Sequence, residues 1–93
     1  MRIYLSGQIS GLDKEEYQQN FRKAAQKYRA QGFEVVNPAC HDADLEYWEY
    51  MKLDMMLIEM CDAICMLKGW EKSHGACLEK SYAEVLGRTV MYE

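Results

Sequence analysis

The sequence predicts an α/β fold, in which a compact four-stranded parallel sheet carries helices on both faces, as in flavodoxin- or Rossmann-like proteins. Short apolar segments alternate along the chain with longer segments whose apolar residues recur at helical spacing, in the order β-α-β-α-β-α-β. Right-handed crossovers between parallel strands leave few other topologies. Because the chain has 93 residues, we expect residues 1–93 to form one domain.

Four short segments are expected to form the strands of the sheet. They are residues 2–5, 33–36, 62–67 and 89–92. The third segment is almost continuously apolar after its first residue, which is typical of a central parallel strand that is buried on both faces.

Three longer segments are expected to be helices, and signals at their ends define them. Asp13 is the expected N-cap of the first helix, with Glu16 completing a capping box, and Gly32 should follow its end. The second helix is expected over residues 45–60. The third should begin after a loop over residues 69–75 and end before Gly87.

The composition favours a small molecule as the ligand. The formal charge is −4 and no basic run is present, so a nucleic-acid polymer is not expected as a partner. No apolar stretch approaches the roughly 20 residues of a membrane span, and the start of the chain lacks the apolar region of a signal peptide. Three of the four cysteines lie in apolar runs, as reduced thiols do, and we expect a cytoplasmic protein that does not bind a membrane.

The cysteines and histidines do not predict a metal site. Cys61 and Cys65 are four residues apart and His41 follows Cys40, but no C-x-x-C pair is present. We therefore expect neither a metal nor another cofactor.

Glu79 is the carboxylate in the least ordinary position. Together with the residues at i+3, i+4 and i+7, it falls on the stripe of the third helix that should face the sheet. The helix follows the central strand, and open α/β sheets bind ligands beyond the carboxyl ends of their strands. The pattern indicates a catalytic carboxylate. The alternative is a surface residue that forms an ion pair with Lys80 or Arg88.

Asp54 borders the apolar side of the second helix, where Trp48, Met51, Met55 and Ile58 are expected to lie. A buried carboxyl group has a raised pKa and can act as a general acid near neutral pH. The alternative is a surface pair with a neighbouring lysine or another chain. Two inward carboxylates in different environments are the arrangement by which glycosyl-transfer enzymes separate a nucleophile from an acid.

Two loops are expected to reach the same edge of the sheet. The first follows the first strand and comprises Ser6, Gly7, Gln8, Ile9, Ser10 and Gly11. Its glycines would let a ligand approach the backbone, although an ordinary turn explains them equally well. In the second loop, Ser73 and Gly75 precede the Glu79 helix, and Ser73 could cap this helix, bind an anion, or do both. Trp70 could stack on a base or contact another subunit.

The residues and their spacing resemble the nucleoside 2-deoxyribosyltransferase superfamily. The resemblance rests on residues 3–11, on Asp54 eight residues before residues 62–64, and on the block S-x-G-A-x-x-E-x-x-x-A-x-x-x-G over residues 73–87. It covers nearly the whole chain in order. The chain is most similar to the small, phage-type uncharacterised branch and to the nucleoside 5′-monophosphate N-glycosidases.

The resemblance implies a mechanism and a site. Glu79 matches the nucleophile that attacks C1′ of the sugar and forms a covalent glycosyl-enzyme. Asp54 matches the carboxylate that protonates or orients the leaving base, and Tyr4 matches a tyrosine that lines the sugar pocket. Water then resolves the intermediate in a hydrolase, and a second base does so in a transferase.

The resemblance also bears on the substrate. The transferases that act on free nucleosides carry Asp where this chain has Ser73, and the monophosphate hydrolases carry Ser. It therefore implies a nucleoside 5′-monophosphate, with Ser6 and the backbone of residues 7–11 helping to hold the phosphate. Ser10 departs from the pattern, because a similar hydrolase has Arg there. Members of the superfamily assemble into dimers and larger oligomers, so we expect at least a homodimer.

We therefore expect an N-glycosidase that acts on a (deoxy)nucleoside 5′-monophosphate, or a related deoxyribosyltransferase. One alternative is a nucleotide-binding module without catalytic activity. Another is an interaction protein that uses Trp48, Trp70 and tyrosines to contact a macromolecule.

Overall fold

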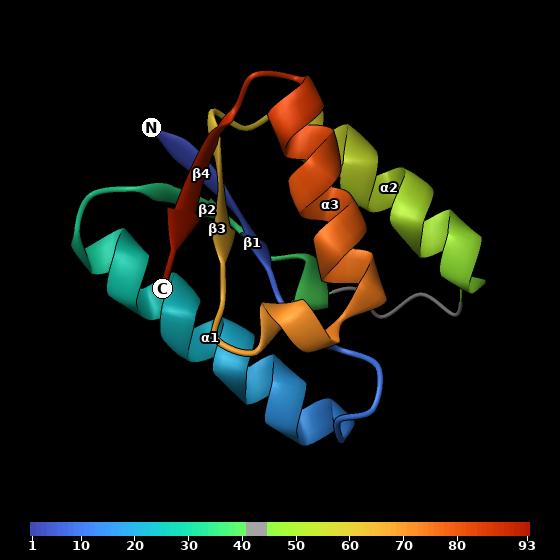
Figure 1. Ribbon diagram of the computed structural model, residues 1–93. Coiled ribbons are helices and arrows are strands. Elements are labelled where there is room, and N and C mark those ends of the chain that lie inside the picture. Colours follow the sequence, from blue (N-terminus) through green and yellow to red (C-terminus); the bar gives the residue numbers. More distant parts are fainter. Residues whose placement is uncertain (41–44) are drawn as a thin grey trace.

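A parallel sheet forms the centre of the protein (Figure 1). The computed structural model describes residues 1–40 and 45–93, and within them four strands are hydrogen-bonded in the order β2-β1-β3-β4. The strands are β1 (Arg2–Ser6), β2 (Glu34–Val36), β3 (Ala63–Met66) and β4 (Thr89–Tyr92). All three pairings are parallel, so the predicted four-stranded parallel sheet is confirmed.

Helices cover both faces of this sheet, as the sequence predicts. They are α1 (Lys14–Ala30), α2 (Tyr47–Glu59) and α3 (His74–Val85), with the single-turn 3₁₀ helices η1 (Pro38–Cys40) and η2 (Trp70–Lys72). One cluster of buried residues joins α1 to the face of Ile3 and Leu5, and a second joins α2 and α3 to the face of Tyr4. Helices α2 and α3 contact each other and lie side by side in Figure 1.

Two details at the helix ends differ from the expectations. Asp13 is the N-cap residue of α1, but its side chain makes no capping hydrogen bond, so the expected capping box with Glu16 does not form. This first turn is exposed, and water solvates its carboxylates, which still complement the helix dipole. Helix α2 begins at Tyr47, two residues later than expected, and the Glu49 carboxylate accepts the Glu46 backbone N–H at 2.9 Å.

The inward side of α2 also differs from the expectation at one residue. Trp48 is 64% exposed and does not share the buried side of Ile58. Helical geometry turns each residue about 100° from the one before it, so Trp48 lies well away from Tyr47, which faces the site described below. Met51 and Met55 are half-buried, as their predicted positions require.

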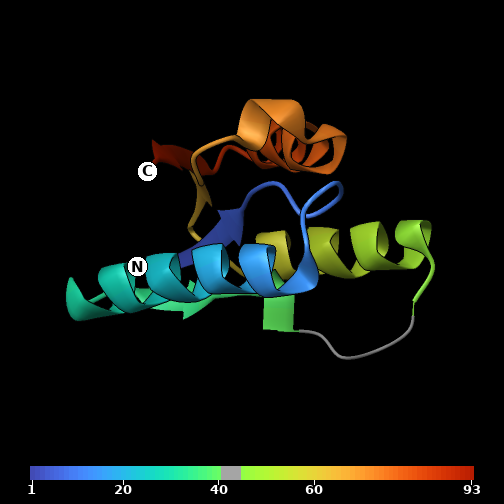
Figure 2. The ribbon, with the colours of Figure 1, turned by 90° about the horizontal axis from the view of Figure 1, so that it is seen from below.

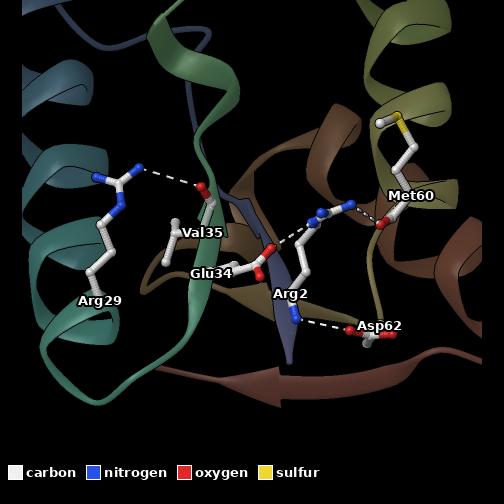
Figure 3. A network of polar contacts seen from close by, with 6 residues as sticks. All are labelled: Arg2, Arg29, Glu34, Val35, Met60 and Asp62. Atoms are coloured by element: carbon white, nitrogen blue, oxygen red, sulfur yellow. Dashed lines mark hydrogen bonds and ion pairs between the residues drawn. The ribbon is translucent and has the colours of Figure 1, made fainter.

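Polar contacts tie together the amino ends of the central strands (Figure 3). The backbone N–H of Arg2 donates to Asp62 Oδ2 at 2.8 Å, and its guanidinium reaches Glu34 and the carbonyl oxygen of Met60, both at 3.1 Å. These contacts fix β1 beside β2 and β3. At the opposite end of the sheet lie the carboxyl ends of the strands and the loops that follow them (Figure 2).

Candidate active site

Glu79 lies on the buried side of α3, and two hydroxyl groups of β1 donate hydrogen bonds to its carboxylate. Its side chain is 6% exposed. The Tyr4 hydroxyl donates to Oε2 and the Ser6 hydroxyl donates to Oε1, each at 2.7 Å. Side chains alternate along a strand, so Tyr4 and Ser6 project from the same face of β1, toward α3. Ser6 takes part because β1 continues one residue beyond the expected end and pairs with Met66.

The alternative for Glu79, an ion pair at the surface, does not occur. Lys80 pairs instead with Glu84 at 3.3 Å, and the Arg88 guanidinium donates to the backbone oxygens of Leu86 and Glu59. The predicted inward orientation of Glu79 is confirmed.

Asp54 faces the same site from α2 and is 9% exposed. Among the described residues, its buried Oδ1 atom has no hydrogen-bond partner. An unsatisfied buried oxygen is costly, and such groups commonly meet a ligand or water. The Oδ1 atom of Asp54 is therefore available to a ligand or to water in the cavity.

The two carboxyl groups have different proton affinities. Burial, followed by the neighbouring negative charge of Glu79, raises the pKa of Asp54 to about 8. Burial also raises the pKa of Glu79, but hydrogen bonds from Ser6 and Tyr4 oppose this rise. The pKa of Tyr4 is raised well above its ordinary value, chiefly by burial, so Tyr4 stays a hydroxyl donor. At neutral pH, Asp54 therefore holds a proton, and the hydroxyl groups of Ser6 and Tyr4 favour the charged form of Glu79.

A cavity of about 780 Å³ contains both carboxyl groups. It lies beyond the carboxyl ends of the strands, where an α/β sheet binds its ligands. Its lining comes from the first loop, both 3₁₀ helices and all three long helices. The lining residues are Gly7, Ile9, Ser10, Tyr17, Pro38, Ala39, Leu45, Tyr47, Tyr50, Met51, Asp54, Lys72, Ser73, His74, Gly75, Ala76 and Glu79. A cavity of this volume suits a ligand the size of a nucleotide.

The residues expected at the site fall into three groups. The cavity brings together seven of them: Gly7, Ile9, Ser10, Asp54, Ser73, Gly75 and Glu79. Tyr4 and Ser6 are not in the cavity lining, and their hydroxyl groups donate to the Glu79 carboxylate. Gln8 and Gly11 lie outside the cavity lining, and the Gln8 amide donates to the Ser10 carbonyl oxygen at 3.2 Å.

The glycines of the first loop have structural explanations. A Cβ atom at Gly7 would lie 3.1 Å from Leu67 Cβ and 3.4 Å from Phe21 Cζ, so close packing in the core requires glycine there. Gly11 has a φ of +87°, a conformation that residues other than glycine rarely adopt. Packing and backbone conformation therefore explain both glycines without a ligand.

Ser73 caps α3 and still has a hydrogen atom to donate. Its Oγ accepts the backbone N–H of Ala76 at 3.1 Å, so the predicted cap is confirmed. A hydroxyl group that accepts one bond can donate another. Within the described residues, the N–H groups of His74 and Gly75, in the first turn, have no partner in the chain.

Several lining residues were not expected from the sequence. Tyr47, Tyr50 and Met51 precede Asp54 by seven, four and three residues, so they share its side of α2. Assigning the stripe from Asp54, and not from Trp48, would have found them. No periodic signal marks Lys72, because it lies in a turn.

Trp70 lies outside the cavity lining. Its ring is 6.1 Å from that of Tyr92, and Lys80 Nζ is 5.6 Å from its centre. Within residues 1–40 and 45–93, no three His, Cys, Asp or Glu side chains are grouped to hold a metal ion, and His41 falls outside these ranges. The same part of the chain has no helix that is long and apolar enough to span a membrane.

A solved structure and a family model each match nearly the whole chain. The solved structure of Clostridium botulinum CMP N-glycosidase, BcmB, matches with a TM-score of 0.68 and 22% sequence identity, over 99% of this chain and 67% of that one. The likeness is consistent with the expected nucleoside 2-deoxyribosyltransferase-like fold. The chain belongs to the family described as a domain of unknown function, DUF4406, whose model matches residues 1–92. No curated protein sequence matches it.

Proposed function

We propose that this protein cleaves the N-glycosidic bond of a (deoxy)nucleoside 5′-monophosphate, or transfers the sugar to another base. The observation that carries this proposal is the pair of buried carboxyl groups in one cavity, where hydroxyl donors hold Glu79 and burial raises the pKa of Asp54. Glycosyl transfer uses such a pair, one member as nucleophile and the other as acid. The likeness in fold to a CMP N-glycosidase supports the same class of reaction.

In the first step, a Glu79 oxygen attacks C1′ of the sugar. The bond between C1′ and the base nitrogen breaks, its electron pair goes to the base, and the Asp54 proton neutralises the base as it leaves. The hydrogen bonds from Tyr4 and Ser6 hold both Glu79 oxygens in place and favour the charged form of the group. The product of this step is a glycosyl ester of Glu79.

In the second step, an acceptor replaces Glu79 at C1′. In a hydrolase, a water oxygen bonds to C1′, Glu79 leaves as a carboxylate, and Asp54, now ionised, takes the water proton. In a transferase, the nitrogen of a second base replaces the water. Both routes return Glu79 and Asp54 to their starting protonation states.

The proposed substrate carries a 5′-phosphate because α3 begins at the cavity. The Ser73 hydroxyl and the N–H groups of His74 and Gly75 can donate to phosphate oxygens there, and the helix dipole favours an anion. Ser6, which was expected to help hold the phosphate, donates to Glu79 instead.

A chromatographic assay for free base tests the proposal. Purified protein is incubated with each common nucleoside and 5′-monophosphate, with and without a second base, beside Glu79→Gln. We expect base release from monophosphates and a loss of at least about a thousandfold in the variant. Gln keeps the size of the side chain and can still bond to both hydroxyl groups, so its melting temperature serves as the control for folding.

Two results of this assay would contradict the proposal. Undiminished base release by folded Glu79→Gln would remove Glu79 as the nucleophile. Nucleotide binding by calorimetry without turnover of any substrate would instead indicate a binding module.

We also propose that the protein acts as at least a homodimer. Exposed large apolar side chains of α2 and its C-cap residue include Trp48, Met56 and Met60, at spacings of eight and four residues. Contiguous exposed apolar side chains commonly mark an interface. Light scattering should give at least twice the monomer mass, and Met56→Glu should lower it. A monomeric wild-type protein at micromolar concentration would overturn this proposal.

A further inference from the structure

The cavity lining carries charges of both signs. It includes the carboxyl groups of Glu79 and Asp54, and Lys72 is the residue among the described lining that carries a fixed positive charge. The first loop contributes Ile9 and Ser10 but no cation. A bound dianion therefore has one lysine or arginine side chain to meet in the described part of the site, beside the imidazole of His74.

The backbone positions Lys72 beside the start of α3. Its N–H donates to the Gly69 carbonyl oxygen at 3.1 Å, which closes the η2 turn directly before Ser73. Six residues separate Ser73 from Glu79, a rise of about 9 Å along the helix. This distance leaves room for a sugar and a phosphate group between them. It also places the backbone of Lys72 well away from Glu79. An ammonium group next to Glu79 would neutralise the charge of its carboxylate.

The side chain of Lys72 is available for a ligand. It is exposed, and it forms no ion pair with another described residue. Lys68, in contrast, is an exposed lysine of the same loop that does not line the cavity.

A second, independent feature indicates that the cavity is built for a ligand. The Oδ1 atom of Asp54 is buried without a partner among the described residues, in a side chain that is 9% exposed and lines the same cavity. The cavity thus contains unsatisfied groups of two kinds: a carboxyl oxygen of Asp54, and the first N–H groups of α3 beside a lysine.

We propose that Lys72 is the residue that selects a 5′-phosphorylated substrate, by binding the phosphate together with the Ser73 hydroxyl and the first N–H groups of α3. This inference rests on the proposed function. A lysine ammonium is a compact charge that binds phosphate without a fixed geometry, which suits a side chain at the exposed edge of a cavity. Its contribution is to binding, so its loss should affect KM more than kcat.

Lys72→Gln tests the proposal, with Lys68→Gln as the matched control and Lys72→Arg as the conservative variant. KM, kcat and the calorimetric dissociation constant are measured for one nucleoside 5′-monophosphate and for the same nucleoside without phosphate. We expect Lys72→Gln to raise KM and Kd for the monophosphate about tenfold or more, because a hydrogen bond to a charged group is lost. The values for the nucleoside should not change. Arg should restore most of the affinity, and Lys68→Gln should behave as the wild type.

Three results would overturn the inference. Equal losses for nucleoside and monophosphate would show that Lys72 acts on the shape of the loop. Wild-type affinity in Lys72→Gln, with base release intact, would refute the role of Lys72 and leave the proposed function standing. If the wild type neither binds nor cleaves any monophosphate, the proposed function fails and this inference fails with it.

Discussion

The Tyr4 hydroxyl donates a 2.7 Å hydrogen bond to Oε2 of Glu79, which lies 75 residues later in the chain. Ser6 makes the equivalent bond to Oε1. Burial alone would favour the neutral form of Glu79, and hydrogen bonds from two hydroxyl groups favour the charged form. The first strand thereby favours the charged form of a buried carboxyl group, as the proposed nucleophile requires.

Tyr4→Phe should move the acidic side of the pH profile to higher pH. Removing a donor destabilises the Glu79 carboxylate, so its pKa rises and it becomes protonated at a higher pH. We expect a shift of about one pH unit, equivalent to about 1.4 kcal/mol, in kcat for base release. Tyr28→Phe, in the cluster on the other face of the sheet, should leave this side of the profile in place. An unmoved profile in Tyr4→Phe would contradict the role of this bond.

The alkaline side of the pH profile for base release should reflect the ionisation of Asp54. Its pKa is raised to about 8, so the acid is lost as the pH rises through this value and base release should fall. Asp54→Asn should remove this decline and lower kcat by about a hundredfold or more at pH 7. The loss should be smaller for a nucleotide whose base leaves readily without a proton. Equal losses for both kinds of base would argue against an acid.

Asp54 should also make stability depend on pH. Its pKa is higher in the folded protein than in the unfolded chain, so between about pH 4 and 8 the folded state holds a proton that the unfolded state has released. The free energy of unfolding therefore falls as the pH rises through this range. Urea denaturation at pH 5 and pH 8.5 should show a decrease at least about 1 kcal/mol larger in the wild type than in Asp54→Asn. Equal decreases would disprove the raised pKa.

Ser73→Asp and Ser73→Ala separate helix capping from phosphate binding. Asp is a good N-cap residue, so Ser73→Asp should keep its stability, but its negative charge should repel a phosphate. Ser73→Ala should lose about 1 kcal/mol of stability with the cap. In competition assays, Ser73→Asp should shift preference from the monophosphate toward the free nucleoside. An unchanged preference would exclude Ser73 from the phosphate site.

Gly7→Ala should reduce stability without selectively weakening substrate binding. The added methyl group would lie 3.1 Å from Leu67 Cβ, closer than ordinary contact, and overpacking of this kind costs about 1–3 kcal/mol. Urea denaturation should show this loss, while KM for the monophosphate stays within about threefold of the wild type. A large rise in KM at full stability would instead assign Gly7 to the ligand.

Local pattern was sufficient for much of the fold. Alternating strands and helices predicted the parallel sheet, and helical spacing placed Glu79 on an inward stripe. The pattern misplaced Trp48, because an exposed aromatic residue has the same apolar character as a buried one. The pattern also assigned Ser6 to the loop, because only its pairing with Met66 shows that the strand continues to this residue.

The sequence by itself determined the order of the elements and indicated which side of its helix each of the two carboxylates lies on, because backbone geometry sets these periods over a few neighbouring residues. The tertiary structure alone decided that Tyr4 and Ser6 bind Glu79, that Lys72 enters the cavity, and that Asp54 holds the proton. These properties arise from desolvation and from charges and donors on segments far apart in the chain. Their effects therefore exist only once the strands and helices are packed together.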